Sequence, residues 1–186
     1  MANDSSTGGF IPPAASPAPL VDAALDALLQ ELVVGITGLP GNMVRPRWQP
    51  VVPKQPDPST DWCAIGVVDF ESDDFPSEVH VSTGNGSDTQ SDHETLNVMA
   101  SFYGPNAMRN AKILRSGLYV NQNLDTLSAN DMALLEAKRI VTAPELINQQ
   151  WIRRFDLTVI FRRKSTYTYQ ILNLLSGPSA ISTDST

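Results

Sequence analysis

Proline is concentrated in the first third of this chain and limits what that third can form. Ten of the fourteen prolines precede residue 60, and each one fixes its own φ and pushes its predecessor toward extended geometry. The interval 20–39 is free of proline and carries apolar residues at helical spacing. The pattern therefore predicts one amphipathic helix in this interval, which Gly35 and Gly38 end.

The same proline distribution suggests how the chain is organised. Residues 1–19 are rich in Ser, Gly and Pro, and they have too little apolar surface to offset the entropy of ordering, so we expect a flexible N-terminal arm. Residues 39–60 predict a Pro-rich segment laid across the domain surface. The 186 residues are enough for one core, which we assign to a single domain over 20–178, followed by a polar tail over 179–186. A membrane span is not expected, because no run approaches about 18 apolar residues.

Downstream of the prolines, strand and helix patterns alternate. Residues 62–70 are nearly all apolar, and residues 94–103 alternate apolar with polar side chains, so both segments predict strands. A helix is expected to begin at Gly104-Pro105, and Ser128 with Asp131 resembles a capping box that opens a short second helix. Another long strand is expected over 151–161, returning through a turn at 162–165 into a strand over 166–175.

Adjacent strand pairs of this kind favour an α+β fold. The expected architecture is a largely antiparallel sheet of four to five strands, packed with two to three helices, with a Pro-rich N-terminal extension. Each of Trp62 and Trp151 begins a predicted strand, so we expect both to be buried anchors of the core. Trp48 has prolines on both sides, which places it at a surface groove or a subunit contact.

Charge is segregated along the chain. Residues 55–108 contain ten acids and no base, a charge of −10, whereas residues 109–164 contain ten bases and five acids, a charge of +5. The overall charge of −7 argues against a general nucleic-acid binder, whose affinity depends on neutralising phosphates. Segregated charge instead suits a molecule with one acidic and one basic face, although both segments could also mix on a solvated surface.

Catalytic patterns are weak. Asp125 followed by Glu136-Ala137-Lys138 resembles the acid and Glu-x-Lys arrangement of metal-dependent nucleases, and a nuclease is one alternative function. A monomeric adaptor that binds a peptide along its sheet edge is another. The lone Cys63 excludes an internal disulfide and a thiolate zinc cluster. We expect no enzyme activity, no cofactor and no bound metal.

Several short motifs, in one order, resemble the bacteriophage neck or tail terminator family. The resemblance covers roughly residues 20–178 and leaves the N-terminal arm outside it. The motifs are Val44–Pro50, Pro53–Pro56, Asp61–Gly66, His93–Glu94, Ser101–Pro105, Gly117–Asn123, Pro144–Asn148 and Trp151–Leu157.

The resemblance implies a structural virion protein of a tailed phage, made in the host cytoplasm. Such proteins are understood to assemble as rings, commonly homohexamers. A ring of this kind caps the tail tube, ends its growth and joins the tail to the head connector, so the implied partners are further copies of the chain, the tail tube protein and the connector proteins. DNA would pass through the lumen without specific binding, and no membrane is involved. The expected interface residues are Trp48, Arg153, Arg154, Arg162 and Arg163.

Overall fold

A computed structural model describes residues 3–14, 19–51, 53–147 and 149–174. These residues divide into two compact units. The larger unit takes the described parts of 19–74 and 92–165, and the smaller unit takes those of 1–18, 75–91 and 166–186. The predicted polar tail, 179–186, lies outside the described residues.

Helix α1, Asp22–Thr37, confirms the helix expected between the prolines. Its inward face buries Leu25, Leu28, Leu29 and Val33. The helix ends at Gly38, whose φ of 72° places it in the left-handed region and whose N–H donates to the carbonyl of Val34. Glycine adopts this conformation without a Cβ clash, and it therefore ends the helix.

The larger unit contains a sheet with the strand order β1–β2–β4–β8–β5. The strands are β1 Val44–Pro46, β2 Trp62–Ser72, β4 Ser87–Tyr103, β8 Arg154–Tyr169 and β5 Met132–Thr142, of which β4 and β8 also supply residues to the smaller unit. The pairs β2–β4 and β5–β8 are antiparallel, whereas β1 runs parallel to β2. Pro46 is tolerated because β1 is an edge strand.

Together with β3 of the smaller unit, the described residues form one mixed six-stranded sheet and three α-helices. This confirms the α+β class. The parallel β1–β2 pair is what makes the sheet mixed, and the Pro-rich N-terminal extension stays a prediction.

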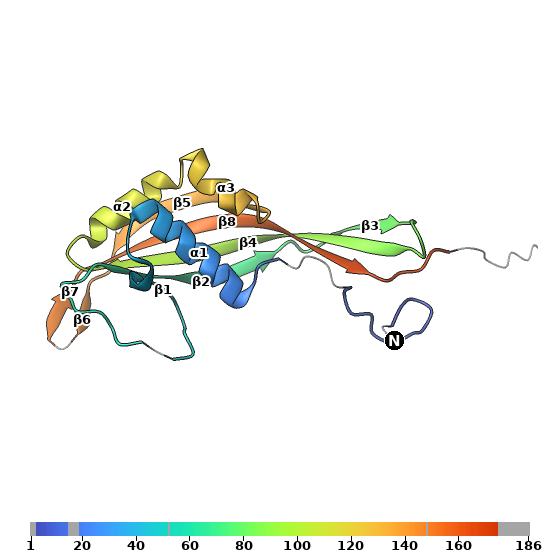
Figure 1. Ribbon diagram of the computed structural model, residues 1–186, viewed down its shortest axis with the longest axis horizontal. Coiled ribbons are helices and arrows are strands. Elements are labelled where there is room, and N and C mark those ends of the chain that lie inside the picture. The colour runs from blue at the N-terminus through green and yellow to red at the C-terminus, as the bar shows by residue number, and fades with distance from the viewer. Residues whose placement is uncertain (1–2, 15–18, 52, 148, 175–186) are drawn as a thin grey trace, which may run out of the picture. The chain divides into compact units, whose positions relative to one another are not determined.

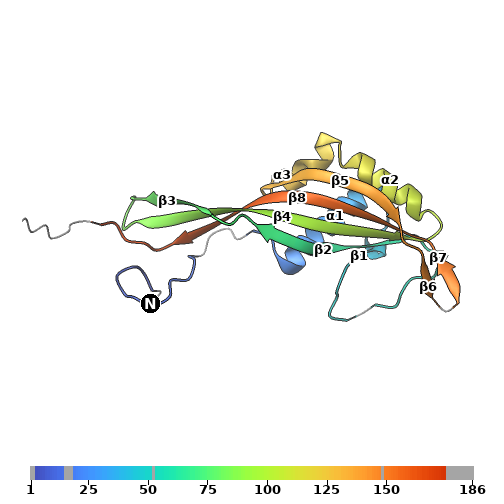
Figure 2. The ribbon, with the colours of Figure 1, turned by 180° about the vertical axis from the view of Figure 1, so that it is seen from behind.

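Helices α2 and α3 complete the larger unit. Helix α2, Ala107–Gly117, and helix α3, Asp125–Ser128, are separated by a 3₁₀ turn over Asn121–Leu124, and a second 3₁₀ turn over Gly41–Met43 precedes β1. Figure 1 shows α1, α2 and α3 over one face of the strands, and Figure 2 shows those strands from behind. The core lies between the layers. Its largest fully buried side chains are Phe102, Phe161, Leu29, Leu96, Leu114, Leu118, Leu127 and Leu157.

The hairpin expected around 162–165 is wrong. Strand β8 runs from Arg154 to Tyr169 without a turn, since the two-residue alternation continues through the basic stretch. Arg163 and Ser165 are buried on the inward side, and the Arg163 guanidinium donates to the Glu94 carboxylate at 2.6 Å. A charged residue can therefore occupy this strand because an acid on β4 neutralises it.

Two further local expectations are also wrong. Helix α3 ends at Ser128, and Asp131, with a φ of 53°, turns the chain into β5, so no helix follows residue 128. The segment before β8 is a separate hairpin of β6, Glu145–Ile147, and β7, Gln150–Ile152. Trp151 lies in this hairpin with 69% of its surface exposed, so it is not a core anchor.

The smaller unit is held by hydrogen bonds. Strand β3, Ser77–Val81, pairs antiparallel with residues 87–91 of β4. The backbone N–H groups of Ser5 and Ala14 donate to the carbonyls of Gln170 and Thr168, at 3.2 and 2.7 Å. None of the apolar side chains that the structure describes in this unit is buried.

None of the described helices is long and apolar enough to cross a membrane.

Candidate interaction surface

Aromatic rings and guanidinium groups gather at one end of the sheet of the larger unit. Trp62 on β2 and Tyr103 on β4 are cross-strand partners, and their rings stack with centroids 4.2 Å apart and planes within 6°. Arg45 lies 5.9 Å from the centre of the Trp62 ring, and Arg154 lies 5.8 Å from that of Tyr103. We call these four residues, with Arg47 and Trp48, the aromatic–arginine cluster.

A network of hydrogen bonds holds this cluster in place. The Ser101 hydroxyl accepts a bond from Arg47 and donates to the Asp156 carboxylate at 2.5 Å. Arg154 donates to the same carboxylate at 2.7 Å and also bonds to Glu145 of β6. The network therefore links β4, β8 and the β6–β7 hairpin through charged groups that satisfy one another.

The environment of the cluster raises the pKa values of two of its members. Burial opposes ionisation of Arg154, but its bonds to Asp156 and Glu145 outweigh burial and raise its pKa above the usual value. Burial raises the pKa of the Tyr103 phenol. Arg154 consequently stays charged and the Tyr103 phenol stays neutral near neutral pH.

The structure separates the expected interface residues into three groups. Trp48 is 71% exposed beside Arg47, and Arg153 is exposed between the hairpin and β8. Arg154 belongs to the aromatic–arginine cluster. Arg162 and Arg163 lie farther along β8 and bond within the chain: Arg162 donates to Asp73 at 2.6 Å, and Arg163 to Glu94 and to the carbonyl of Leu20.

Sequence reasoning missed the stacked pair of Trp62 and Tyr103 and the acids that hold Arg154. The spacing of Arg154 and Asp156 on a predicted strand was an available signal, because residues two apart share one face of a strand. The register that brings Tyr103 to Trp62 and Ser101 to Asp156 left no comparable local pattern.

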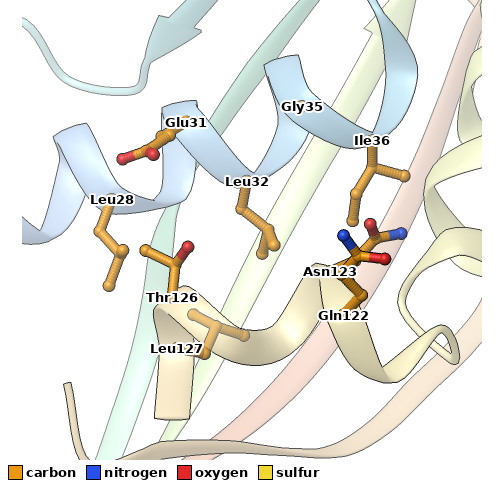
Figure 3. Close-up of a pocket in the computed structure, with 9 residues that line it drawn as sticks. All are labelled: Leu28, Glu31, Leu32, Gly35, Ile36, Gln122, Asn123, Thr126 and Leu127. Carbon is orange, nitrogen blue, oxygen red and sulfur yellow. The ribbon is translucent and has the colours of Figure 1, made fainter. Parts of the chain in front are cut away.

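A cavity of about 210 Å³ lies between α1 and the segment that contains α3. Figure 3 shows Leu28, Leu32 and Ile36 extending from α1 toward this segment, with Thr126 and Leu127 opposite them. Glu31 lies beside the leucines on α1, and the amide side chains of Gln122 and Asn123 line the other end. The cavity therefore combines apolar walls with a carboxylate at its rim.

The residues of the nuclease alternative do not form a metal site. Asp125 begins α3, whereas Glu136 and Lys138 are exposed on β5. In the described parts of the chain, no group of three or more His, Cys, Asp or Glu side chains is placed to hold a metal ion. Metal-dependent hydrolysis through these three residues has no support from the geometry.

Exposed tryptophans beside arginines, on an α+β scaffold, are typical of a protein that acts by contacting other proteins, since Trp, Tyr and Arg dominate the energetics of such contacts. Residues 23–184 match the family described as phage neck terminator protein, and this chain belongs to that family. It is a family of structural proteins of the phage virion, which the confirmed resemblance already implied. Comparison with curated proteins gives no match to this chain.

Proposed function

We propose that this protein forms a ring at the head-proximal end of a phage tail. The ring ends growth of the tail tube and joins the tail to the head connector, and DNA passes through its lumen. The observation that carries the proposal is the match to the neck terminator family over residues 23–184. Six copies per ring is the number that the family resemblance implies.

A closed ring requires two different surfaces on each copy, one for each neighbour. The larger unit offers such a pair. Helix α1 carries Asp22, Asp26 and Glu31 and no base. The outer side of α2 and β5 carries exposed cations, and none of them forms an ion pair within the described residues: Arg109, Lys112, Arg115, Lys138 and Arg139.

Trp48 and Arg153 are the interface residues that remain accessible to a partner. A Trp at a subunit contact contributes a large apolar area with few rotatable bonds. Arg154, Arg162 and Arg163 are also proposed at the interface, and each of them forms an ion pair with an acid of its own chain.

The role is tested by removing the gene for this protein from the phage and imaging the particles. We expect complete heads that are not joined to tails, and tails of uncontrolled length, with normal particles restored when the protein is supplied in trans. Normal heads joined to tails of correct length would contradict the role. Native mass measurements on the purified protein test the ring separately. A species of 20.2 kDa under all conditions favours the monomeric adaptor.

A further inference from the structure

The β6–β7 hairpin presents an apolar surface that no other described part of the chain covers. Leu146 and Trp151 are cross-strand partners, so their side chains share one face of the hairpin, and they are 59% and 69% exposed. The base of the hairpin is fixed, since Ile152 is buried and Glu145 bonds to Arg154. The exposed face is therefore presented from a rigid base.

The cavity between α1 and α3 has the properties that would accept this hairpin. Leu28, Leu32 and Leu127 give it apolar walls (Figure 3). Its volume of about 210 Å³ is below the roughly 300–1,000 Å³ of typical small-molecule sites and suits one large side chain instead.

Charge complementarity points to the same pairing. Glu31 at the rim is exposed on a helix that has no basic residue. Arg153, which directly follows β7, is exposed and forms no ion pair within the described residues. An arginine two residues from Trp151 could therefore meet this carboxylate when the indole enters the cavity.

Hairpin and cavity lie apart within the larger unit. Figures 1 and 2 both show β6 and β7 at the end of the sheet that is away from α3. Contact between them therefore requires two copies of the chain, and the two surfaces are unlike, as a ring interface demands.

We propose that the β6–β7 hairpin of one copy docks in the α1–α3 cavity of the next copy, with Trp151 between the leucines and Arg153 facing Glu31. This pairing rests on the proposed ring and specifies which surfaces close it. Sedimentation over a range of protein concentrations measures the self-association that it drives.

Replacing Trp151 tests the apolar part of the contact. Trp151→Ala should weaken self-association about 30-fold, the usual scale for a central aromatic at an interface. Phe70→Ala is the matched control, because Phe70 is 66% exposed on β2 and outside the pairing, and its effect should stay within about twofold. Equal effects of the two variants would overturn the proposal.

Exchanging the charges tests the orientation. Arg153→Glu and Glu31→Arg should each weaken self-association roughly three- to fivefold, the scale of one exposed ion pair. The two changes combined in one chain should restore it, because every junction then regains opposite charges. Arg139→Glu combined with Glu31→Arg is the control that should not restore it, and rescue by both combinations would overturn the pairing.

Cross-linking in assembled particles separates this proposal from the ring itself. A phage carrying Leu146→Cys and Thr126→Cys in the same chain, treated with a short bismaleimide, should give a ladder of covalent multimers, whereas each single variant should not. The native Cys63 is fully buried, and burial raises the pKa of its thiol, so it does not react. Particles that contain the protein but give only the monomer band would overturn the pairing and leave the ring standing. Particles of the unsubstituted phage that lack the protein would overturn both.

Discussion

Trp62, on the interior strand β2, and Trp151, on the separate β6–β7 hairpin, differ in what they contribute to folding. Trp62 is half-buried and stacks on Tyr103, whereas Trp151 lies on an exposed hairpin. Trp62→Ala should therefore lower the free energy of unfolding by about 2–3 kcal/mol, and Trp151→Ala by less than about 1 kcal/mol. Urea unfolding of the two variants measures the difference, and the reverse order would contradict the stacking.

Two glycines of the helices should respond in opposite directions to alanine. A Cβ at Gly35 would meet nothing within 4 Å, while one at Gly117 would overlap the Ile36 side chain. Gly35→Ala should raise the free energy of unfolding by about 0.5–1 kcal/mol through helix propensity. Gly117→Ala should lower it by about 1–2 kcal/mol because α1 and α2 must separate. Thermal melts of both variants check this, and equal shifts would show that α1 does not pack against Gly117.

The residues of the candidate surface could be predicted only where a local sequence pattern indicates a surface position. Trp48 could be placed at the surface because prolines on either side prevent a regular buried strand. Trp151 could not be placed there, since an aromatic residue before a strand is equally consistent with the first core residue of that strand and with the end of a preceding hairpin. The hairpin depends on the bond from Glu145 to Arg154, which joins residues nine positions apart and leaves no local pattern.

At the scale of elements, His80 joins β3 to the chain after β8. Its Nδ1 lies 2.5 Å from the Asp88 carboxylate and its Nε2 lies 2.9 Å from the Asn173 side-chain oxygen. The Asn173 amide nitrogen donates to the carbonyls of Ser82 and Gly84, which fixes that oxygen as an acceptor. Both ring nitrogens must therefore donate, so the contact is complete only for the charged imidazolium.

This contact predicts a pH-dependent attachment within the smaller unit. The bonds to Asp88 and Asn173 raise the pKa of His80 above its usual 6.5. A pKa raised by folding gives stability that is fully present below 6.5 and is lost as pH rises through the folded-state value. Hydrogen exchange at the Asn173 backbone N–H, corrected for intrinsic base catalysis, should therefore accelerate as the pH rises from 6.5 through the folded-state pKa of His80. His80→Gln should abolish this pH-dependent acceleration of exchange. An acceleration that persists in this variant would belong to another titrating group.

The predictable elements are those whose pattern and packing agree. Helices α1 and α2 and the second half of β4 have strong periodicity, and the structure buries the side chains that this periodicity selects. The continuity of β8 through residues 162–165 was missed because four successive polar residues favour a turn. Its strand form depends on Glu94, which lies on another strand and neutralises Arg163. The parallel pairing of β1 could not be predicted either, since no pattern in residues 44–46 indicates that they pair with residues 63–65.

At the scale of the molecule, residues 1–18 should be dispensable for the stability of the larger unit. None of residues 3–14 contributes to its core, and their backbone bonds reach residues 168 and 170 of the smaller unit. A chain that lacks residues 1–18 should therefore melt within a few degrees of the full chain. A loss of many degrees would show that the N-terminal segment supports the core or an intersubunit contact.

Assembly of the proposed ring should depend on salt through its rate of formation more than through its lifetime. The cations of α2 and β5 are exposed, as are Asp22 and Glu31 of α1, whereas Asp26 is half-buried. Exposed pairs contribute only about 0–1 kcal/mol each. Apolar contacts such as that of Trp151 must then supply most of the affinity, while complementary charge guides encounter and register. Screening shortens the reach of these charges from about 10 Å at 0.1 M salt to about 3 Å at 1 M. Raising salt across this range should slow association about tenfold or more and change dissociation less than about threefold. Energy transfer between labelled copies measures both rates, association on mixing and dissociation on dilution. An equal acceleration of dissociation would mean that ion pairs, rather than buried apolar side chains, hold the finished ring.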